Sequence, residues 1–316
     1  MASSSSPVGL GSALSSMALD ADHRPLPEIS SDVPTWLHRA LADVPQRRTI
    51  DVAGAGIETL LWDRGAGPGI LLFHGHGAHA DWWRPTAPFL TQAAGRVVSF
   101  SLSGMGASAW RDHYELAGFA DEAVAVAAAT LGDPGRRPYL VAHSFGCLPA
   151  MMAADRMGDA ISGLVLVDFY LPPPRRSSER APPRQVRRYD SADAALARFR
   201  LSPEQECGTP GLLDFVARRT LVNVPSDTGE HWTWCTDPRT SIPIDHAASR
   251  ETFASLRVPV TLVRGEQSRL VDRAIVDHQR EIAPPGTRFV EIPEADHHVL
   301  LDQPLALAAA IRTLLG

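Results

Sequence analysis

The chain has 316 residues, of which 44% are hydrophobic, and its formal net charge is -6 at pH 7. This size and composition predict a soluble globular protein with one large core and an added subdomain. The acidic balance argues against nucleic acid as a partner, since phosphate binding relies on clustered cations. No stretch reaches the roughly 18 uncharged apolar residues of a membrane span, and the N-terminus lacks a signal-peptide pattern. We therefore expect a cytoplasmic protein without a membrane partner.

The first residues, 1–31, are rich in Ser, Pro and Ala with weak periodicity, and we expect a flexible arm there. Apolar residues at helical intervals predict a short helix within 32–44. Strands and helices then alternate as far as residue 168. The predicted strands are 47–52, 57–63, 69–73, 96–102, 137–143 and 162–168, and the helices lie at 84–94, 119–131 and 145–157. Strands of near-continuous Val, Leu and Ile indicate an α/β fold with a mostly parallel, doubly wound sheet.

The alternation stops in residues 169–257, which we interpret as a helical lid inserted after the sixth strand. This segment begins with a Pro- and Arg-rich stretch and continues with two short helical pieces and the loop GEHWTWCTDP. The β/α alternation resumes afterwards with strands at 258–265 and 287–292 and helices at 270–282 and 303–315. The core thus consists of two parts, 32–168 and 258–316.

The cysteines and the arginine-rich stretch give weaker indications. Cys147, Cys207 and Cys235 lie far apart and form no C-x-x-C pair, which indicates neither a disulfide framework nor a thiolate zinc site. Residues 175–188 carry six arginines against one glutamate. Such a run is usually a solvated loop, and the alternative is contact with an anionic substrate or another surface.

One serine lies in a distinctive turn. In PYLVAHSFGCLPAMMA, Ser144 stands between an apolar strand and a helix, with Ala142 two residues before it and Gly146 two after. A sharp strand-to-helix turn strains its central residue, and only small neighbours at these positions avoid clashes. The hydroxyl would then project beside a helix N-terminus, which favours developing negative charge.

With this turn the chain resembles the α/β-hydrolase family, and the similarity covers residues 48–316. The family motif G-x-S-x-G corresponds to residues 142–146, with alanine for the first glycine. The resemblance implies that Ser144 is a nucleophile. It further implies a lidded esterase or lactonase.

The histidine-rich segment LLFHGHGAHADWWRP, residues 71–85, permits two interpretations. His74, His76 and His79 resemble the H-x-H-x-D-H zinc motif of metallo-β-lactamases, but alanine stands at the aspartate position and the serine turn would have no role there. In the α/β-hydrolase family a His-Gly pair ends the third strand. His74 with its glycine matches that pair, which implies an oxyanion hole formed by the backbone N–H groups of His76 and Phe145.

The segment IPEADHHVLLDQP, residues 292–304, resembles the terminal histidine segment of the family. Counting back from Pro304 indicates His297 as the general base, with His298 as the alternative.

The position of the carboxylic acid that would orient the general base departs from the usual family pattern. Most members carry it three residues after a glycine that follows strand seven, and Ser268 occupies that position here. Other members carry it at the end of strand six, which implies Asp168, at the edge where α/β sheets form their sites. Glu266 is the second choice and Asp272 the third.

We interpret the protein as a serine hydrolase that cleaves a carboxylic ester or lactone through an acyl-enzyme. Aromatic residues favour a small-to-medium hydrophobic substrate, although at least half of them are expected to pack lid against core. They are Phe169, Tyr170, Phe199, Phe215, Trp232, Trp234, Trp82 and Trp83. The alternatives are a C–C bond hydrolase or acyltransferase on the same fold, a non-catalytic ligand receptor and a zinc hydrolase. The sequence has no nucleotide or flavin fingerprint, so we expect no cofactor and no metal; it does not indicate the oligomeric state.

Overall fold

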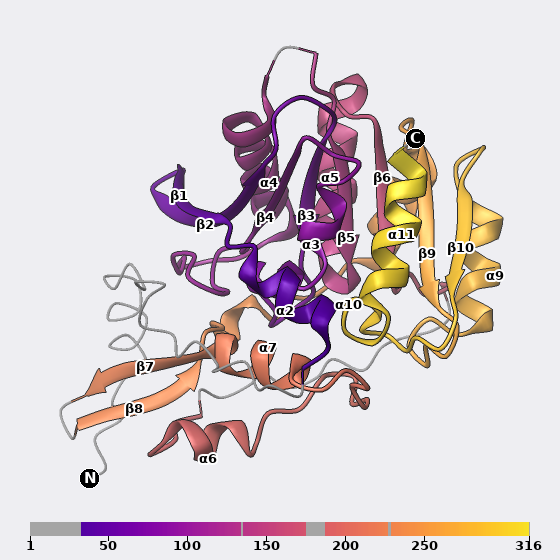
Figure 1. Cartoon of the computed structure of the whole chain (residues 1–316). Coiled ribbons are helices and arrows are strands. Elements are labelled where there is room, and N and C mark those ends of the chain that lie inside the picture. The colour runs from indigo at the N-terminus through magenta and orange to yellow at the C-terminus, as the bar shows by residue number, and fades with distance from the viewer. Residues whose placement is uncertain (1–32, 134, 175–186, 227–228, 316) are drawn as a thin grey trace, which may run out of the picture.

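The computed structural model describes residues 33–133, 135–174, 187–226 and 229–315 (Figure 1). The expected arm, 1–31, lies outside the described residues, as does the arginine-rich stretch except for Arg187 and Arg188. None of the helices in the described part of the chain has the length and apolar character needed to cross a membrane.

An eight-stranded sheet runs through the fold in the order β1-β2-β4-β3-β5-β6-β9-β10. Its strands are β1 (Gln46–Val52), β2 (Ala55–Asp63), β3 (Gly69–Phe73), β4 (Arg96–Phe100), β5 (Tyr139–His143), β6 (Gly163–Val167), β9 (Val260–Gly265) and β10 (Arg288–Ile292). The pairs β1–β2 and β2–β4 are antiparallel, and every pair from β4 to β10 is parallel. The predicted α/β fold with a mostly parallel sheet is confirmed.

The sheet separates two hydrophobic cores. Along β3, Leu71 and Phe73 belong to the core that contains α4 and α5, while Ile70 and Leu72 belong to the core with α3 and α11. Apolar residues on both faces explain the continuous apolar runs of the strands. The helices that cover the sheet are α2 (Thr35–Ala42), η2 (Ala80–Trp83), α3 (Ala87–Leu90), α4 (Leu116–Leu131), η3 (Ser144–Gly146), α5 (Cys147–Met157), η4 (Gly158–Ala160), α9 (Arg273–Ile282), α10 (Val299–Asp302) and α11 (Pro304–Leu315).

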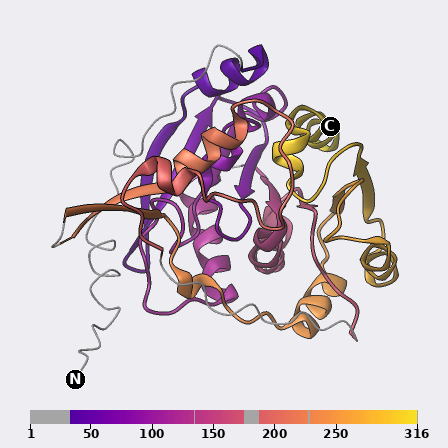
Figure 2. The same ribbon diagram turned by 90° about the horizontal axis from the view of Figure 1, so that it is seen from below.

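A segment between β6 and β9 interrupts the alternation. It contains α6 (Ala192–Leu196), α7 (Leu212–Thr220), β7 (Leu221–Ser226), β8 (Gly229–Trp234), η5 (Pro238–Thr240) and α8 (His246–Ser255). The labelled elements α6, α7, β7 and β8 lie below the sheet in Figure 1, and the view from below in Figure 2 shows them in front of it. We call the part from α6 to η5 the insertion. The last helix, α8, packs instead against α5 and α9.

The insertion contains a two-stranded antiparallel ribbon, β7–β8, where the sequence predicted helix and loop. Val222 and Val224 are buried with Cys235 in a small cluster of their own, against which Trp110 packs. Alternating β-branched residues that pack on one face are typical of a strand, and this explains why α7 ends at Thr220.

Candidate active site

Ser144 occupies the sharp turn between β5 and α5. Its backbone φ is 53°, in the left-handed region, where a non-glycine residue stores about 1–3 kcal/mol of strain. A Cβ at Gly146 would collide with the backbone carbonyl oxygen of His74, so only glycine fits there. Ser144 is partly exposed, whereas His143 before it is buried. The turn therefore presents the hydroxyl to the solvent-accessible end of the sheet.

Ser144, His297 and Asp168 form a continuous chain of hydrogen bonds. Ser144 Oγ lies 2.9 Å from His297 Nε2, and His297 Nδ1 lies 2.6 Å from Asp168 Oδ2. Since an ionised carboxylate only accepts, Nδ1 carries the proton and Nε2 has a free lone pair directed at the serine hydroxyl. His297 is 1% exposed and Asp168 0%, so little water weakens their interaction. The structure thus brings together the three residues that the sequence analysis assigned to catalysis.

The carboxylate of Asp168 is held by the neighbouring strand β9. Its Oδ1 accepts the backbone N–H of Gly265 at 3.1 Å, and its Oδ2 accepts the hydroxyl of Ser268 at 2.7 Å. Ser268 occupies the position at which the sequence analysis expected the acid in most family members, and here it donates to Asp168. Asp168 also has a positive φ of 47°, which turns the side chain out of the end of β6.

The alternative candidates are engaged elsewhere. Glu266 is exposed and accepts the backbone N–H of Glu294 at 3.0 Å. Asp272 is the N-cap of α9 and accepts the backbone N–H of Ile275. His298 packs its ring against Trp82, with the ring centroids 5.8 Å apart.

The loop after β3 packs directly against the serine turn. A Cβ at Gly75 would lie 3.0 Å from His143 Nδ1 and 3.3 Å from the Cβ of Ser144. This close approach sets the backbone of His76, one of the two expected oxyanion donors, beside the turn that contains Phe145, the other. The rings of His76 and Phe145 also pack edge to face at 5.5 Å.

The three histidines of the zinc-like segment serve separate parts of the fold. Nε2 of His74 accepts the backbone N–H of Leu102, and burial lowers the pKa of His74 to about 4. His79 Nε2 lies 3.1 Å from the hydroxyl of Thr220 in α7. His76 is exposed, and its Nε2 lies 3.3 Å from Thr240 Oγ1. With these separate partners the segment does not resemble a metal cage.

A buried ion pair joins the insertion to η2, which follows the loop after β3. Asp81 in η2 is 0% exposed and accepts Arg219 of α7 at 3.0 Å, and Arg219 itself is 1% exposed. Asp81 also accepts Arg47 at 3.1 Å. Because a buried charge needs its partner, this contact fixes α7 above the loop.

Two polar residues that the sequence analysis did not identify hold the histidine loop. The Nε2–H of His143 donates to the backbone carbonyl of His297 at 3.0 Å. Gln205 from the insertion accepts the backbone N–H of His298 at 2.9 Å and donates to the carboxylate of Asp302. The only sequence signal for His143 was its place beside Ser144, and Gln205 gave none.

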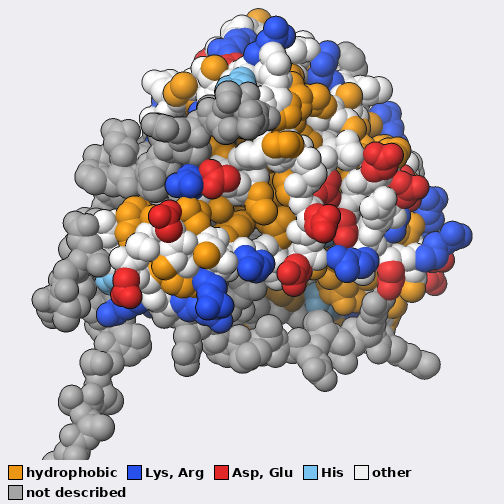
Figure 3. All heavy atoms as spheres, turned by 60° about the horizontal axis from the view of Figure 1, so that its bottom comes forward, with side chains coloured by type: hydrophobic (Ala, Val, Ile, Leu, Met, Phe, Trp, Pro, Cys, Tyr) orange, Lys and Arg blue, Asp and Glu red, His pale blue; other side chains and the backbone are white. Residues whose placement is uncertain are grey.

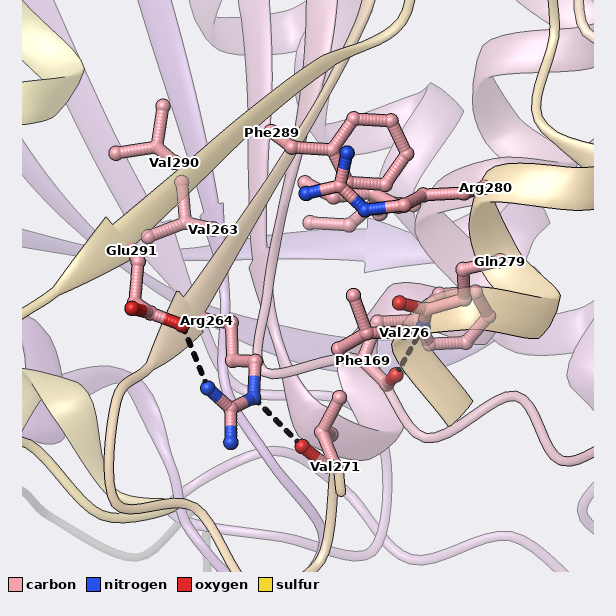
Figure 4. Close-up of a pocket in the computed structure, with 12 residues that line it drawn as sticks. Phe169, Val263, Arg264, Val271, Val276, Gln279, Arg280, Phe289, Val290 and Glu291 are labelled. Carbon is pink, nitrogen blue, oxygen red and sulfur yellow. Dashed lines mark hydrogen bonds and ion pairs between the residues drawn. The ribbon is translucent and has the colours of Figure 1, made fainter. Parts of the chain in front are cut away.

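Behind the acid lies a separate cavity of about 160 Å³ between β9, β10 and α9 (Figure 4). Gln279 donates to the backbone carbonyl of Phe169 at 2.6 Å and so anchors the residue that follows Asp168. Arg264 at this cavity donates to Glu291 and to the carbonyl of Val271. The bond from Gln279 thus holds the chain beside Asp168 from α9.

Known proteins share this fold and sequence pattern. Esterase Rv0045c of Mycobacterium tuberculosis (strain ATCC 25618 / H37Rv) is 28% identical over 276 residues, which cover 84% of this chain and 88% of that protein. A thioesterase domain from the curacin biosynthetic pathway superposes with a TM-score of 0.69 at 23% identity, covering 86% of this chain and 99% of that one. A structure of the M. tuberculosis esterase from work on its transition metal inhibition gives a TM-score of 0.67 at 22% identity, covering 88% of this chain and 97% of that one. The sequence model of the alpha/beta hydrolase family matches residues 70–310, and the chain belongs to that family.

Proposed function

We propose that the protein is a serine hydrolase that cleaves a carboxylic ester or lactone of a small-to-medium hydrophobic substrate. The observation that carries the proposal is the hydrogen-bonded chain from Ser144 through His297 to Asp168, at the end of a strained turn. Membership of the alpha/beta hydrolase family and the similarity to an esterase support hydrolysis of an ester.

In the first half of the proposed reaction, Ser144 Oγ attacks the carbonyl carbon while His297 Nε2 takes its proton. Asp168 stabilises the resulting imidazolium through the 2.6 Å bond to Nδ1. The oxyanion accepts the backbone N–H groups of His76 and Phe145, and each such donor contributes about 10²–10³-fold to kcat.

His297 then returns the proton to the leaving alcohol, and an acyl-enzyme on Ser144 remains. In the second half, water takes the place of the serine hydroxyl: His297 removes its proton, the hydroxide adds to the acyl carbon, and Ser144 leaves with the proton.

A hydrophobic substrate is supported by aromatic residues that remain partly exposed. Of the eight aromatics considered, Trp82, Trp83, Phe169 and Phe215 are buried and pack within the fold. The other four are partly exposed, namely Tyr170, Phe199, Trp232 and Trp234. Phe199 and Trp234 lie 5.6 Å apart. Figure 3 shows the molecule with the bottom of Figure 1 turned forward, and hydrophobic side chains gather there between charged ones.

Active-site labelling tests the proposal. A fluorophosphonate reacts with an activated serine, and we expect one adduct, mapped by peptide mass spectrometry to Ser144 and absent in Ser144→Ala. A panel of p-nitrophenyl esters and lactones then measures turnover. A labelled residue other than Ser144 would overturn the mechanism.

Labelled water separates hydrolysis from the other chemistries of this fold. Hydrolysis of an ester places one solvent oxygen in the acid product, whereas acyl transfer to an added alcohol yields an ester without it. Cleavage of a diketone panel in place of esters would indicate a C–C bond hydrolase, and stoichiometric binding without turnover would indicate a receptor.

A further inference from the structure

Three buried histidines crowd together beside the nucleophile. His143 precedes Ser144, and His297 and His298 are adjacent in the loop after β10. One ring nitrogen from each lies within 4.8 Å of those from the other two. The ring centroids are 5.0, 5.6 and 4.9 Å apart, and the residues are 1%, 1% and 6% exposed.

Two of these rings, those of His143 and His298, have buried nitrogens without a hydrogen-bond partner in the described part of the chain. His143 donates through Nε2 to the carbonyl of His297, so its Nδ1 carries a lone pair, and Nδ1 has no hydrogen-bond partner among the described residues. Neither ring nitrogen of His298 makes a hydrogen bond of normal geometry in the described part of the chain, although backbone carbonyls of Ser202 and Pro203 lie near. Buried nitrogens without partners cost free energy, and a bound cation would supply the missing interaction.

We propose that His143, His297 and His298 bind a divalent transition metal such as Zn²⁺, and that the bound metal inhibits the enzyme. Zn²⁺ binds neutral imidazole at about 2.0–2.1 Å, so the ligand nitrogens of a tetrahedral site lie about 3.4 Å apart. The rings therefore have to approach one another by roughly 1 Å, which side-chain rotation supplies. Ser144 Oγ, 2.9 Å from His297 Nε2, or solvent would complete four ligands.

The hydrogen bonds behind two of the rings are those that metal-binding histidines use. A ligating imidazole almost always donates its other N–H to a carboxylate or a backbone carbonyl, which fixes the tautomer. His297 donates its Nδ1–H to Asp168, and His143 donates its Nε2–H to a carbonyl. Each ring therefore keeps a lone pair on its other nitrogen, and that of His297 faces the hydroxyl of Ser144. Mg²⁺ and Ca²⁺ prefer oxygen ligands, so this set selects against them.

Inhibition follows from the atom that the metal occupies, and this part rests on the proposed function. Nε2 of His297 must accept the proton of Ser144 for the serine to attack. A metal on that lone pair removes the base and separates it from the hydroxyl.

Zinc inhibition and metal binding are measured separately, so that one can fail without the other. Metal-free protein is assayed with a p-nitrophenyl ester during titration with ZnCl₂ or MgCl₂, and EDTA is added afterwards. Co²⁺ binding to the inactive Ser144→Ala protein is followed by visible absorption, which is intense when Co²⁺ is tetrahedral. We expect inhibition by Zn²⁺ that EDTA reverses, none by Mg²⁺, and the tetrahedral Co²⁺ spectrum.

The variants His298→Gln and His143→Gln identify the ligands. Each is expected to raise the half-inhibitory Zn²⁺ concentration, relative to its own uninhibited rate, by about tenfold or more. Either change in a Ser144→Ala background should weaken the Co²⁺ spectrum. The control His113→Gln, at an exposed histidine, should leave both readouts unchanged.

Unchanged zinc sensitivity in both folded ligand variants, or equal inhibition by Mg²⁺, would overturn the site. If the protein hydrolyses no ester but loses Co²⁺ binding in His298→Gln, the proposed function fails and the metal site stands.

Discussion

Replacing Asp168 by asparagine keeps the shape of the side chain but alters its hydrogen bond to His297, the proposed base. The carboxylate accepts three donors, from His297 at 2.6 Å, Ser268 at 2.7 Å and the N–H of Gly265 at 3.1 Å. An asparagine side chain offers only one oxygen to accept hydrogen bonds from these three donors. If that oxygen faces His297, the amide NH₂ meets the N–H of Gly265, a buried mismatch of about 1–3 kcal/mol.

The other orientation is therefore favoured, with the oxygen on Gly265 and the NH₂ facing His297. The imidazole then accepts at Nδ1 and carries its proton on Nε2, where it cannot accept the serine proton. Loss of the base tautomer and of the charge that stabilises the imidazolium is expected to lower kcat by about 10⁴-fold, or about 5 kcal/mol.

The assay is steady-state hydrolysis of a p-nitrophenyl ester, with thermal unfolding as the check on folding. Ser268→Ala removes one charge-assisted hydrogen bond but keeps the charge, so its loss should not exceed about 10–100-fold. Glu266→Gln, at an exposed carboxylate, should be silent. An Asp168→Asn protein that melts normally and keeps more than about a tenth of kcat would refute this reasoning.

Three further predictions concern the insertion and the buried histidines. Arg219→Met removes one buried ion-pair partner of Asp81, which keeps Arg47 at 3.1 Å and Arg84 at 3.8 Å. Urea unfolding should therefore show a loss of about 3 kcal/mol, the lower end for a broken buried pair, and a loss no larger than that of Arg218→Met, at an exposed pair, would contradict this. Gln205→Ala frees the backbone of the histidine loop, so kcat should fall about tenfold with KM little changed, and a change confined to KM would argue against a positioning role. Burial lowers the pKa of His74 to about 4 and that of His298 to about 3, from 6.5. The unfolded chain therefore binds protons first as pH falls, and the free energy of unfolding should decline below about pH 6.5. His298→Gln should reduce the slope of this decline, and an unchanged slope would show that His298 does not contribute.

The sequence predicted the sheet well because its strands are buried on both faces. The predicted strand at 69–73 has the observed bounds of β3, and both ends of the serine turn were found from small residues and apolar runs. Local pattern suffices there, since a fully buried strand needs an unbroken apolar run.

Other elements depend on contacts that local pattern does not contain. The helix predicted at 84–94 is instead the short α3, Ala87–Leu90, in a stretch that contains Pro85 and Pro88. The helix α8 was missed because most of its residues are polar and Phe253 is its main buried anchor. The ribbon β7–β8 pairs Val222 with Thr233, which helical spacing in α7 did not foretell.

The site shows the same division between local and tertiary information. The nucleophile and the histidine follow from motifs, but the choice among carboxylates needs the distance between two strand ends. The partners Asp168 and Ser268 are 100 residues apart in the chain and 2.7 Å apart in space. No spacing rule in a single sequence connects them.

The adjacency of β6 and β9 has a consequence for how relatives are surveyed. Because β6 and β9 end side by side, a carboxylate at the end of either strand can reach the imidazole of His297. A hydroxyl at the end of the other strand then donates a hydrogen bond to that carboxylate. A search that requires an acidic residue after the strand equivalent to β9 would classify this chain as an inactive member of the family. Apparent pseudoenzymes with serine at that column therefore merit inspection of the preceding strand before they are dismissed.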